Sequence, residues 1–300
     1  MSISIQHISK SFKNVTAVKD ISFDVKEGEL FGLIGPDGAG KTTLFRILTT
    51  LLIADEGTAT VADFDVIKDY KSIRNHVGYM PGKFSLYQDL TVEENLEFFA
   101  TIFGTSIEEN YDLIKDIYIQ IEPFKTRKAG KLSGGMKQKL ALCCALIHKP
   151  KVLFLDEPTT GVDPVSRKEF WEMLKRLQQK GITILVSTPY MDEAALCDRI
   201  ALIQDGEILQ IDTPQEIVKH YPKKIYNVSA NNMYKLIKNL NEYEYNYSVY
   251  PFGEFVHYTD KRTNFNPEDL LKYLTMENLK NISIEITQPT IEDTFMELAK

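Results

Sequence analysis

The stretch Gly35-Pro36-Asp37-Gly38-Ala39-Gly40-Lys41-Thr42-Thr43 follows the short apolar run Leu30–Ile34. The run predicts a buried strand, and Leu44–Leu51 predicts the helix after it. The pattern Gly35-x4-Gly40-Lys41-Thr42 in a strand-to-helix turn is typical of a P-loop, which binds nucleotide phosphates. A glycine-rich turn without function is the alternative.

The residue types of this stretch suit phosphate chemistry. Glycines let backbone N–H groups close around phosphate oxygens, and the next helix directs its positive end at the anion. Lys41 adds a full charge, and the Thr42 hydroxyl is a ligand for Mg²⁺. The predicted nucleotide contacts are Gly35, Gly38, Ala39, Gly40, Lys41, Thr42 and Thr43. We expect the Asp37 side chain to point to solvent.

A second apolar strand, Val152–Leu155, ends in two carboxylates, Asp156 and Glu157. Ligands bind at the carboxyl ends of parallel strands. We therefore expect Asp156 to hold Mg²⁺ and Glu157 to polarise the attacking water as a general base. A solvated turn is the alternative, and the P-loop argues against it.

Leu132-Ser133-Gly134-Gly135-Met136 opens a predicted helix that runs to Ile147. Its N-terminus is a second candidate anion site. With these motifs, residues 1–218 resemble the ABC ATPase family, whose signature reads LSGGQ; Met136 replaces the usual Gln.

The resemblance implies a dimer. In the family, Ser133, Gly134 and Gly135 bind the γ-phosphate of an ATP held by the opposite subunit. Phe12 stands where the family stacks an aromatic ring on adenine, with core packing as the alternative. Asp163 matches an aspartate that communicates between the two sites.

Two positions depart from the family pattern. Gly82 replaces the Q-loop glutamine, and Pro189 replaces the switch histidine that contacts the γ-phosphate. Proline offers no side-chain donor or acceptor. We therefore expect slow hydrolysis at this chain's own site, which favours a heterodimer with a second ABC ATPase over a homodimer. The alternative is that other groups serve at these positions.

Alternating strands and helices predict an α/β P-loop NTPase core with an antiparallel β layer, spanning residues 1–220, with a helical subdomain over about 86–149. Ser2–His7 and Ile21–Val25 are the expected strands of the β layer. Thr91 and Glu94 form the pattern of a capping box. The aromatic-rich stretch Phe84–Phe103 is the expected partner contact, with internal packing as the alternative.

Residues 221–300 predict a small α+β extension. The expected order is βαββαβ, a ferredoxin-like split unit, with a hairpin turn at Pro251-Phe252-Gly253. Gln288–Phe295 is similar to the end of ATPases of ABC-2-type exporters. We expect this extension either to regulate the dimer or to serve only as a packing element.

Composition excludes several classes. The net charge of −7 argues against a nucleic-acid partner. The three cysteines, Cys143, Cys144 and Cys197, have no metal spacing and predict small buried side chains. No signal peptide and no apolar run of about 18 residues are found, so we expect a cytoplasmic protein held at the inner face of the cell membrane by permease subunits.

The expected function is an ATP-hydrolysing subunit of an ABC-2-type exporter that uses ATP and Mg²⁺. The alternatives are a non-hydrolysing regulatory ATP-binding module and a non-transport ABC ATPase. The latter usually carries two ATPase modules, a long coiled coil or zinc-binding cysteine pairs, and these are absent from the sequence.

Overall fold

The computed structural model describes residues 1–300. Contacts within the chain divide it into two compact units, Met1–Gln215 and Glu216–Leu298. The division falls within α7 (Pro214–Lys219), slightly earlier than the expected boundary at residue 220. None of the helices is long and apolar enough to span a bilayer.

A six-stranded sheet forms the centre of the first unit, in the order β10-β9-β3-β8-β7-β6. All neighbours are parallel except β9 and β10. Every residue of β3, β7 and β8 is buried, which explains the apolar runs Leu30–Ile34 and Val152–Leu155. The bounds are β3 (Leu30–Ile34), β6 (Val77–Met80), β7 (Val152–Asp156), β8 (Thr183–Thr188), β9 (Arg199–Gln204) and β10 (Glu207–Asp212).

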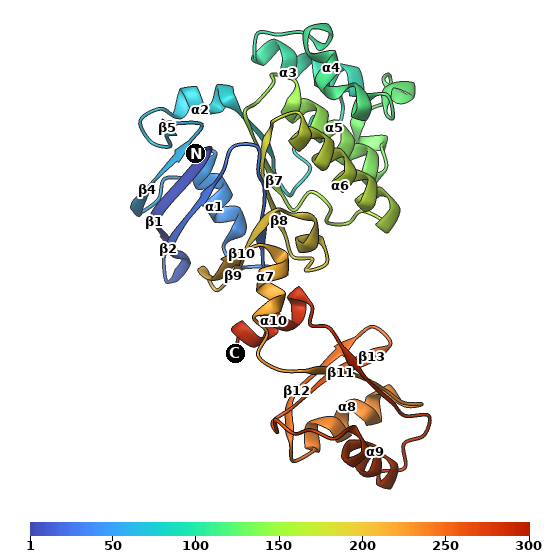
Figure 1. The fold of residues 1–300 in the computed structure, drawn as a ribbon. Helices are drawn as coiled ribbons and strands as arrows, with labels where there is room; N and C mark the ends of the chain where they lie inside the picture. The colour runs from blue at the N-terminus through green and yellow to red at the C-terminus, as the bar shows by residue number, and fades with distance from the viewer. The chain divides into compact units, whose positions relative to one another are not determined.

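An antiparallel layer, in the order β2-β1-β4-β5, lies on one side of this sheet (Figure 1). Its strands are β1 (Ile3–Phe12), β2 (Val15–Val25), β4 (Glu56–Val61) and β5 (Phe64–Asp65). β1 and β2 are longer than expected, because register shifts around Ile8 interrupt the alternation by which a strand is recognised.

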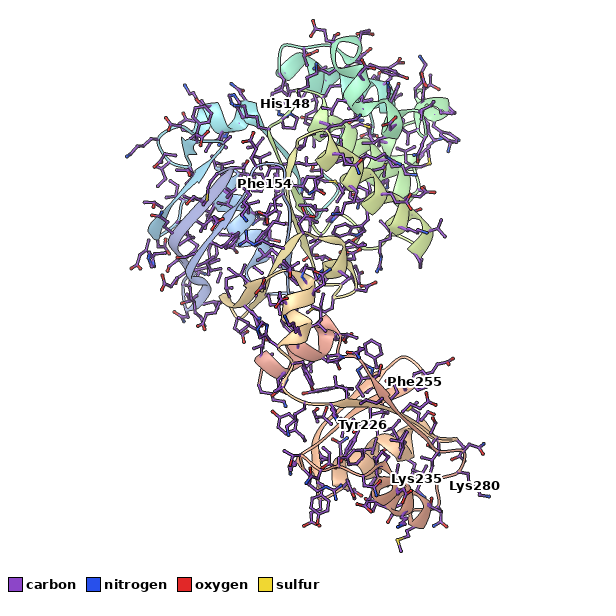
Figure 2. All side chains as sticks on the ribbon, in the orientation of Figure 1. His148, Phe154, Tyr226, Lys235, Phe255 and Lys280 are labelled. Atoms are coloured by element: carbon purple, nitrogen blue, oxygen red, sulfur yellow. The ribbon has the colours of Figure 1, made fainter.

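Helix α1 (Lys41–Leu48) packs its apolar face into a core shared with residues of both sheets. Phe45 of this helix meets Phe154 of β7 edge to face, with ring centroids 5.9 Å apart. Figure 2 shows Phe154 deep inside this unit. The P-loop, which precedes α1, is therefore anchored at both ends by buried elements.

The helical part contains α3 (Val92–Ile102), α4 (Ile107–Tyr118) and α5 (Gly134–Leu146). The expected capping box is present: Glu94 N donates to Thr91 Oγ1 at 3.2 Å, and Thr91 N donates to Glu94 Oε2 at 2.7 Å. The other helices of this unit are α2 (Tyr70–His76) and α6 (Pro164–Gln179), with short 3₁₀ turns at Glu122–Phe124, Ala129–Lys131 and Glu193–Leu196.

All three cysteines are buried. Burial raises the pKa of each thiol, so these side chains stay protonated and pack as small apolar groups.

The second unit has the order β11-α8-β12-β13-α9-β14 along the chain and an antiparallel sheet in the order β12-β13-β11-β14. This is the strand order of a ferredoxin-like split βαβ unit. Tyr226, labelled in Figure 2, belongs to the core between the sheet and the two helices. The bounds are β11 (Ile225–Ser229), α8 (Met233–Glu242), β12 (Asn246–Phe252), β13 (Phe255–Asp260), α9 (Pro267–Met276) and β14 (Ser283–Thr287).

We expected the hairpin turn at Pro251-Phe252-Gly253, and the observed turn lies slightly later in the chain. Pro251 and Phe252 belong to β12 and pair with β13, and the chain turns at Gly253, where φ is +58°. Because β12 is an edge strand, it tolerates a proline without losing a ladder hydrogen bond.

Helix α10 (Ile291–Leu298) explains the motif near the C-terminus. Asp293 Oδ2 accepts hydrogen bonds from Thr290 N and Thr290 Oγ1, both at 2.7 Å. Its Oδ1 accepts one from the buried His257 ring of β13, also at 2.7 Å. The motif therefore starts α10 and ties it to the sheet of its own unit.

Candidate nucleotide-binding site

The P-loop has the backbone of a phosphate cradle. Gly38 and Gly40 have φ values of +84° and +99°, which side-chain-bearing residues rarely adopt. A Cβ on Gly40 would lie 2.2 Å from the Ala17 carbonyl oxygen. The turn encloses a pocket of about 160 Å³ lined by Ala17, Asp37, Gly38, Ala39, Gly40, Lys41, Thr42, Thr43 and Glu157. Gly35 closes against Ile203, since a Cβ there would lie 2.1 Å from the Ile203 carbonyl oxygen.

Lys41 lies at the base of this pocket with only 3% of its surface exposed. Its ammonium donates to the carbonyl oxygens of Gly35 at 2.8 Å and Pro36 at 2.9 Å. It also forms an ion pair with Glu157 Oε1 at 3.1 Å. A buried cation with three acceptors is well satisfied, and a phosphate group is the kind of anion that competes for it.

Asp156 is 2% exposed, and both of its carboxylate oxygens have partners. Oδ2 accepts a hydrogen bond from Thr42 Oγ1 at 2.8 Å, and Oδ1 accepts one from Ser187 Oγ at 2.7 Å. The structure thus brings Thr42 and Asp156 together across 114 residues of sequence.

This oxygen pair fits a magnesium ion. Mg²⁺ in nucleotide sites is usually bound by one or two protein oxygens, with phosphates and waters completing the shell. No group of three or more His, Cys, Asp or Glu side chains is arranged to hold a metal alone. A shared site with a nucleotide therefore suits these residues better than a metal site made by the protein only.

Glu157 follows β7 with φ at +51°, a left-handed conformation that is costly for a residue with a side chain. Its backbone N–H is held by Ser187, whose carbonyl oxygen and Oγ both accept at 3.1 Å. This turn places the Glu157 carboxylate in the P-loop pocket.

The signature residues lie in another part of the unit. Ser133 is the N-cap of α5, and its Oγ accepts from Met136 N at 3.4 Å. A Cβ on Gly135 would lie 2.9 Å from Ser166 Oγ, so α5 and α6 begin side by side. Ser133, Gly134 and Gly135 do not line the P-loop pocket of the same chain.

Asp163 is the N-cap of α6. Its Oδ1 accepts from Ser166 N at 3.0 Å and Val165 N at 3.1 Å. These hydrogen bonds lower the pKa of the exposed Asp163 carboxyl, and the one from Ser166 has the largest effect. Asp163 is therefore ionised beside the start of α5.

Phe12 ends β1 with 47% of its surface exposed, and Lys10 Nζ lies 5.7 Å from its ring centroid. Core packing, the alternative for this residue, does not agree with that exposure. The ring is free to stack on a ligand.

The two departures from the family pattern are Gly82 and Pro189. Gly82 adjoins Asp156, because a Cβ there would be 3.1 Å from its carbonyl oxygen and 3.9 Å from Oδ2. Pro189 follows β8, two positions after Ser187. One ring nitrogen of each of the five histidines is engaged elsewhere in the chain. Their partners are Asp20 for His7, Ser72 for His76, Val77 for His148, Glu216 for His220 and Asp293 for His257.

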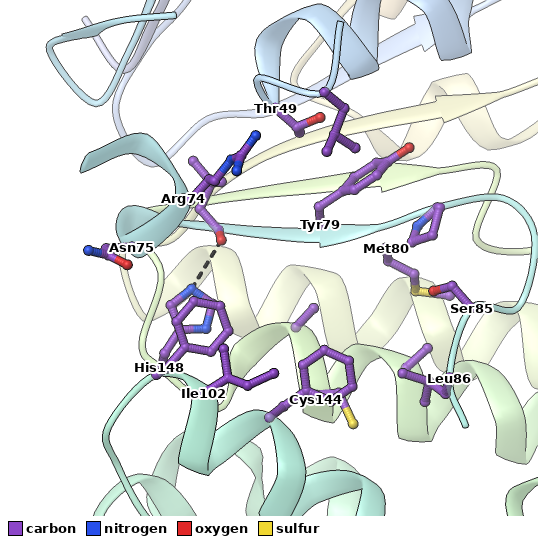
Figure 3. Close-up of a pocket in the computed structure, with 17 residues that line it drawn as sticks. Thr49, Arg74, Asn75, Tyr79, Met80, Ser85, Leu86, Ile102, Cys144 and His148 are labelled. Carbon is purple, nitrogen blue, oxygen red and sulfur yellow. Dashed lines mark hydrogen bonds between the residues drawn. The ribbon is translucent and has the colours of Figure 1, made fainter. Parts of the chain in front are cut away.

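A groove of about 450 Å³ lies between the central sheet and the helical part (Figure 3). One wall is aromatic and aliphatic, with Phe99, Ile102 and Phe103 from α3 and the residues after it. The His148 ring stacks on Phe103 at 3.8 Å, and its Nε2 donates to the Val77 carbonyl oxygen at 3.0 Å, the dashed line in Figure 3. Burial lowers the pKa of His148, so the imidazole is neutral at pH 7.

Sequence reasoning missed several residues of the site. Ser187 carries no motif and is found only through the pairing of β7 with β8. Side chains outside the motifs also fix the end of β8 and the residues after it. Thr188 Oγ1 donates a hydrogen bond to the buried Glu193 at 2.5 Å, and the Arg167 guanidinium lies 4.1 Å from the Tyr190 ring centroid.

A P-loop beside a strand that ends in an Asp-Glu pair defines the class of P-loop NTPases. Residues 18–160 match the family model described as ABC transporter. Over 302 residues the chain is 32% identical to the Nod factor export ATP-binding protein I of Rhizobium sp. (strain N33), covering 99% of this chain and 97% of that one. The chain belongs to the ATP-binding proteins of ABC transporters and is therefore an ABC ATPase.

Other relatives match 72% of this chain. The chain is 41% identical over 217 residues to the probable multidrug ABC transporter ATP-binding protein YbhF of Escherichia coli (strain K12), covering 72% of this chain but only 38% of the length of YbhF. It is 36% identical over 218 residues to the linearmycin resistance ATP-binding protein LnrL of Bacillus subtilis (strain 168), covering 72% of this chain and 70% of LnrL.

Solved structures agree on the fold. CbiO1 from Clostridium perfringens, part of an ABC transporter complex, superimposes with a TM-score of 0.65 at 26% identity, covering 73% of this chain and 91% of that one. The ATP-binding cassette MJ0796, solved as a dimer bound to ADP and phosphate, gives a TM-score of 0.64 at 26% identity, covering 70% of this chain and 98% of that one.

Proposed function

We propose that this chain binds and hydrolyses Mg-ATP as the ATPase subunit of an ABC-2-type exporter, with separate permease subunits forming the transport path. The observation that carries the proposal is that two residues of the P-loop contact the acidic pair at the end of β7: Lys41 forms an ion pair with Glu157, and Thr42 donates a hydrogen bond to Asp156. The names of the relatives, which refer to Nod factor export, multidrug transport and linearmycin resistance, support export.

The residues have distinct roles in hydrolysis. The P-loop amides and Lys41 bind the phosphates, which draws the ammonium away from Glu157. The freed Glu157 carboxylate then accepts a proton from the attacking water. Mg²⁺, when bound through Thr42 and Asp156, supplies neutralisation of the phosphate charge.

Two copies complete the sites. We infer that Ser133, Gly134 and Gly135 cover the γ-phosphate on the partner subunit, since the N-terminus of α5 is an anion site that its own P-loop does not use. Asp163, beside that helix start, relays the state of one site to the other. The exposed Phe12 ring stacks on adenine.

The chain's own site turns over slowly, and the working assembly is a heterodimer with a second ABC ATPase. This rests on Gly82 beside Asp156 and on Pro189 after β8, neither of which has a polar side chain. Loss of one preorganised polar contact to a transferring phosphate costs about 10²–10³ in rate.

The test compares ATPase rates of wild type, Pro189→His, and Pro189→His combined with Gly82→Gln. We expect Pro189→His to raise the rate by at least about tenfold. The double variant needs a small local shift, because a side chain at residue 82 meets Asp156 at 3.1 Å. A fast wild-type protein, with no gain in either variant, would contradict a degenerate site.

The same two positions favour a second candidate function, a regulatory module that binds ATP without hydrolysing it. Adding the partner ATPase and permease separates the two candidates. A partner-dependent turnover that is lost when Glu157 of this chain is replaced by Gln supports hydrolysis here. Turnover that is unaffected by Glu157→Gln supports the regulatory module.

The groove of Figure 3 is the proposed binding site for the permease, which would hold the chain at the inner face of the membrane. Aromatic and aliphatic walls suit a helical segment of a partner. Ile102→Glu in the groove should abolish co-purification with the permease. The matched control is Ile119→Glu after α4, because the two side chains are similarly exposed, at 59% and 60%. If equal amounts of permease co-purify with both variants, the groove is not the permease-binding site.

A further inference from the structure

Ser187 occupies a specific place beside the two acidic residues of the site. β7 and β8 are parallel neighbours, and their register pairs Asp156 with Ser187. Both side chains are essentially inaccessible, at 2% and 0% exposure. The Ser187 hydroxyl is therefore shielded from water, and all of its hydrogen bonds are to other groups of the protein.

The hydrogen bonds of this hydroxyl have a fixed direction. A serine hydroxyl has one proton to donate and two lone pairs that accept. The Glu157 N–H at 3.1 Å can only donate, so it takes a lone pair. The carboxylate of Asp156 at 2.7 Å can only accept when ionised, so it takes the proton. Ser187 thus links both acidic residues through one oxygen atom.

The two oxygens of Asp156 are divided between two hydroxyls. Ser187 holds Oδ1, and Thr42 holds Oδ2 on the side of the P-loop. Thr42 donates its proton to Oδ2, so the lone pairs of its hydroxyl stay available for a cation. Ser187, which holds Oδ1, keeps the carboxylate turned so that Oδ2 faces the P-loop.

We propose that Ser187 is a positioning residue for the divalent cation: it fixes the Asp156 carboxylate and the left-handed turn at Glu157, and so sets the cation affinity of the nucleotide complex. This inference rests on the proposed binding of Mg-ATP. Groups that orient a metal-binding side chain typically change metal affinity by 10–100-fold when removed.

The test measures binding of a fluorescent ATP analogue, first in EDTA and then against increasing Mg²⁺ or Mn²⁺. Ser187→Ala should bind the analogue in EDTA as the wild type does, within about twofold. Its half-saturating cation concentration should rise by about tenfold or more. Ser187→Thr, which keeps the hydroxyl, should restore the wild-type value.

A matched control lies on the same strand. Thr183 begins β8, is buried, and accepts one hydrogen bond from Gly28 N at 3.0 Å, away from the P-loop. Thr183→Val removes that bond and should leave the cation dependence unchanged. Thermal unfolding of both variants confirms that each is folded.

Each outcome has a clear meaning. A cation dependence of Ser187→Ala equal to the wild type overturns the inference. Equal shifts in Ser187→Ala and Thr183→Val overturn it too, because the effect is then general to the strand. A wild-type protein that fails to bind the analogue at all overturns the proposed function instead.

Discussion

Single residues in the P-loop differ in what they demand of the backbone. Gly38 and Gly40 both have positive φ, but only Gly40 has an atom in the way, the Ala17 carbonyl oxygen at 2.2 Å from a Cβ. At Gly38 the same space is open to beyond 4 Å.

This contrast gives a matched pair of variants. Gly38→Ala should cost about 1 kcal/mol, the price of a left-handed residue. Gly40→Ala should cost about 3 kcal/mol or more, because overlap adds to the backbone cost. Denaturant unfolding of the two variants measures the difference. Equal losses would mean that the loop moves freely away from Ala17.

At the residue scale, the sequence predicted the chemical groups but not their mutual contacts. Lys41, Thr42, Asp156 and Glu157 belong to short motifs in which each residue type is dictated by phosphate or metal chemistry. Ser187 belongs to no motif, and its role follows only from the register of β7 with β8. Such non-local pairing is not encoded in any short stretch of sequence.

At the scale of elements, helix α3 depends on its cap. Thr91→Ala removes the side-chain acceptor of the Glu94 N–H, which should lower the free energy of unfolding by about 1 kcal/mol. Thr101→Ala, at an exposed position near the end of the same helix, is the control and should have little effect. Equal effects of the two changes would show that the cap does not stabilise the helix.

The contact of His148 with Phe103 predicts a pH dependence. The pKa of His148 is lowered by burial and, to a smaller extent, by His76, so the folded protein binds this proton less readily than the unfolded chain. The contribution of His148 to the free energy of unfolding should therefore be constant above about pH 6.5. It should fall as the pH drops below that value.

His148→Gln removes this titration. The difference in unfolding free energy between wild type and variant should shrink or reverse between pH 7 and pH 5, measured by denaturant unfolding at both values. A difference that stays constant over this range would show that His148 titrates alike in both states.

Elements with a clear period or cap were predictable from sequence, and irregular ones were not. The buried strands β3 and β7 and the helix α5 fall close to their expected bounds. β1 and β2 extend past theirs because bulges break the period-two pattern. The hairpin of the second unit turns at Gly253 because an edge strand accommodates Pro251.

At the scale of the whole molecule, two units have separate cores. Calorimetry should therefore resolve two unfolding transitions. Mg-ATP at 100 times its dissociation constant should stabilise only the unit that contains the P-loop, by about 2.7 kcal/mol.

The variant Asp293→Ala identifies the unfolding transition of the second unit. It removes the partner of His257 and the cap of α10, both inside the second unit. The variant should lower only the transition that Mg-ATP leaves unchanged. A single transition that responds to both ligand and variant would show that the chain unfolds as one cooperative body.

The most direct test of the central claim is equilibrium binding of ATP to the wild type and to Lys41→Ala. The buried ammonium of Lys41 is held at the base of the P-loop pocket, and a charged hydrogen bond to phosphate contributes roughly 1.5–3 kcal/mol, so affinity should fall about 10–100-fold. Lys71→Ala, at an exposed position on α2, should bind as the wild type does. Unchanged affinity in Lys41→Ala would contradict the assignment of this loop as the phosphate site.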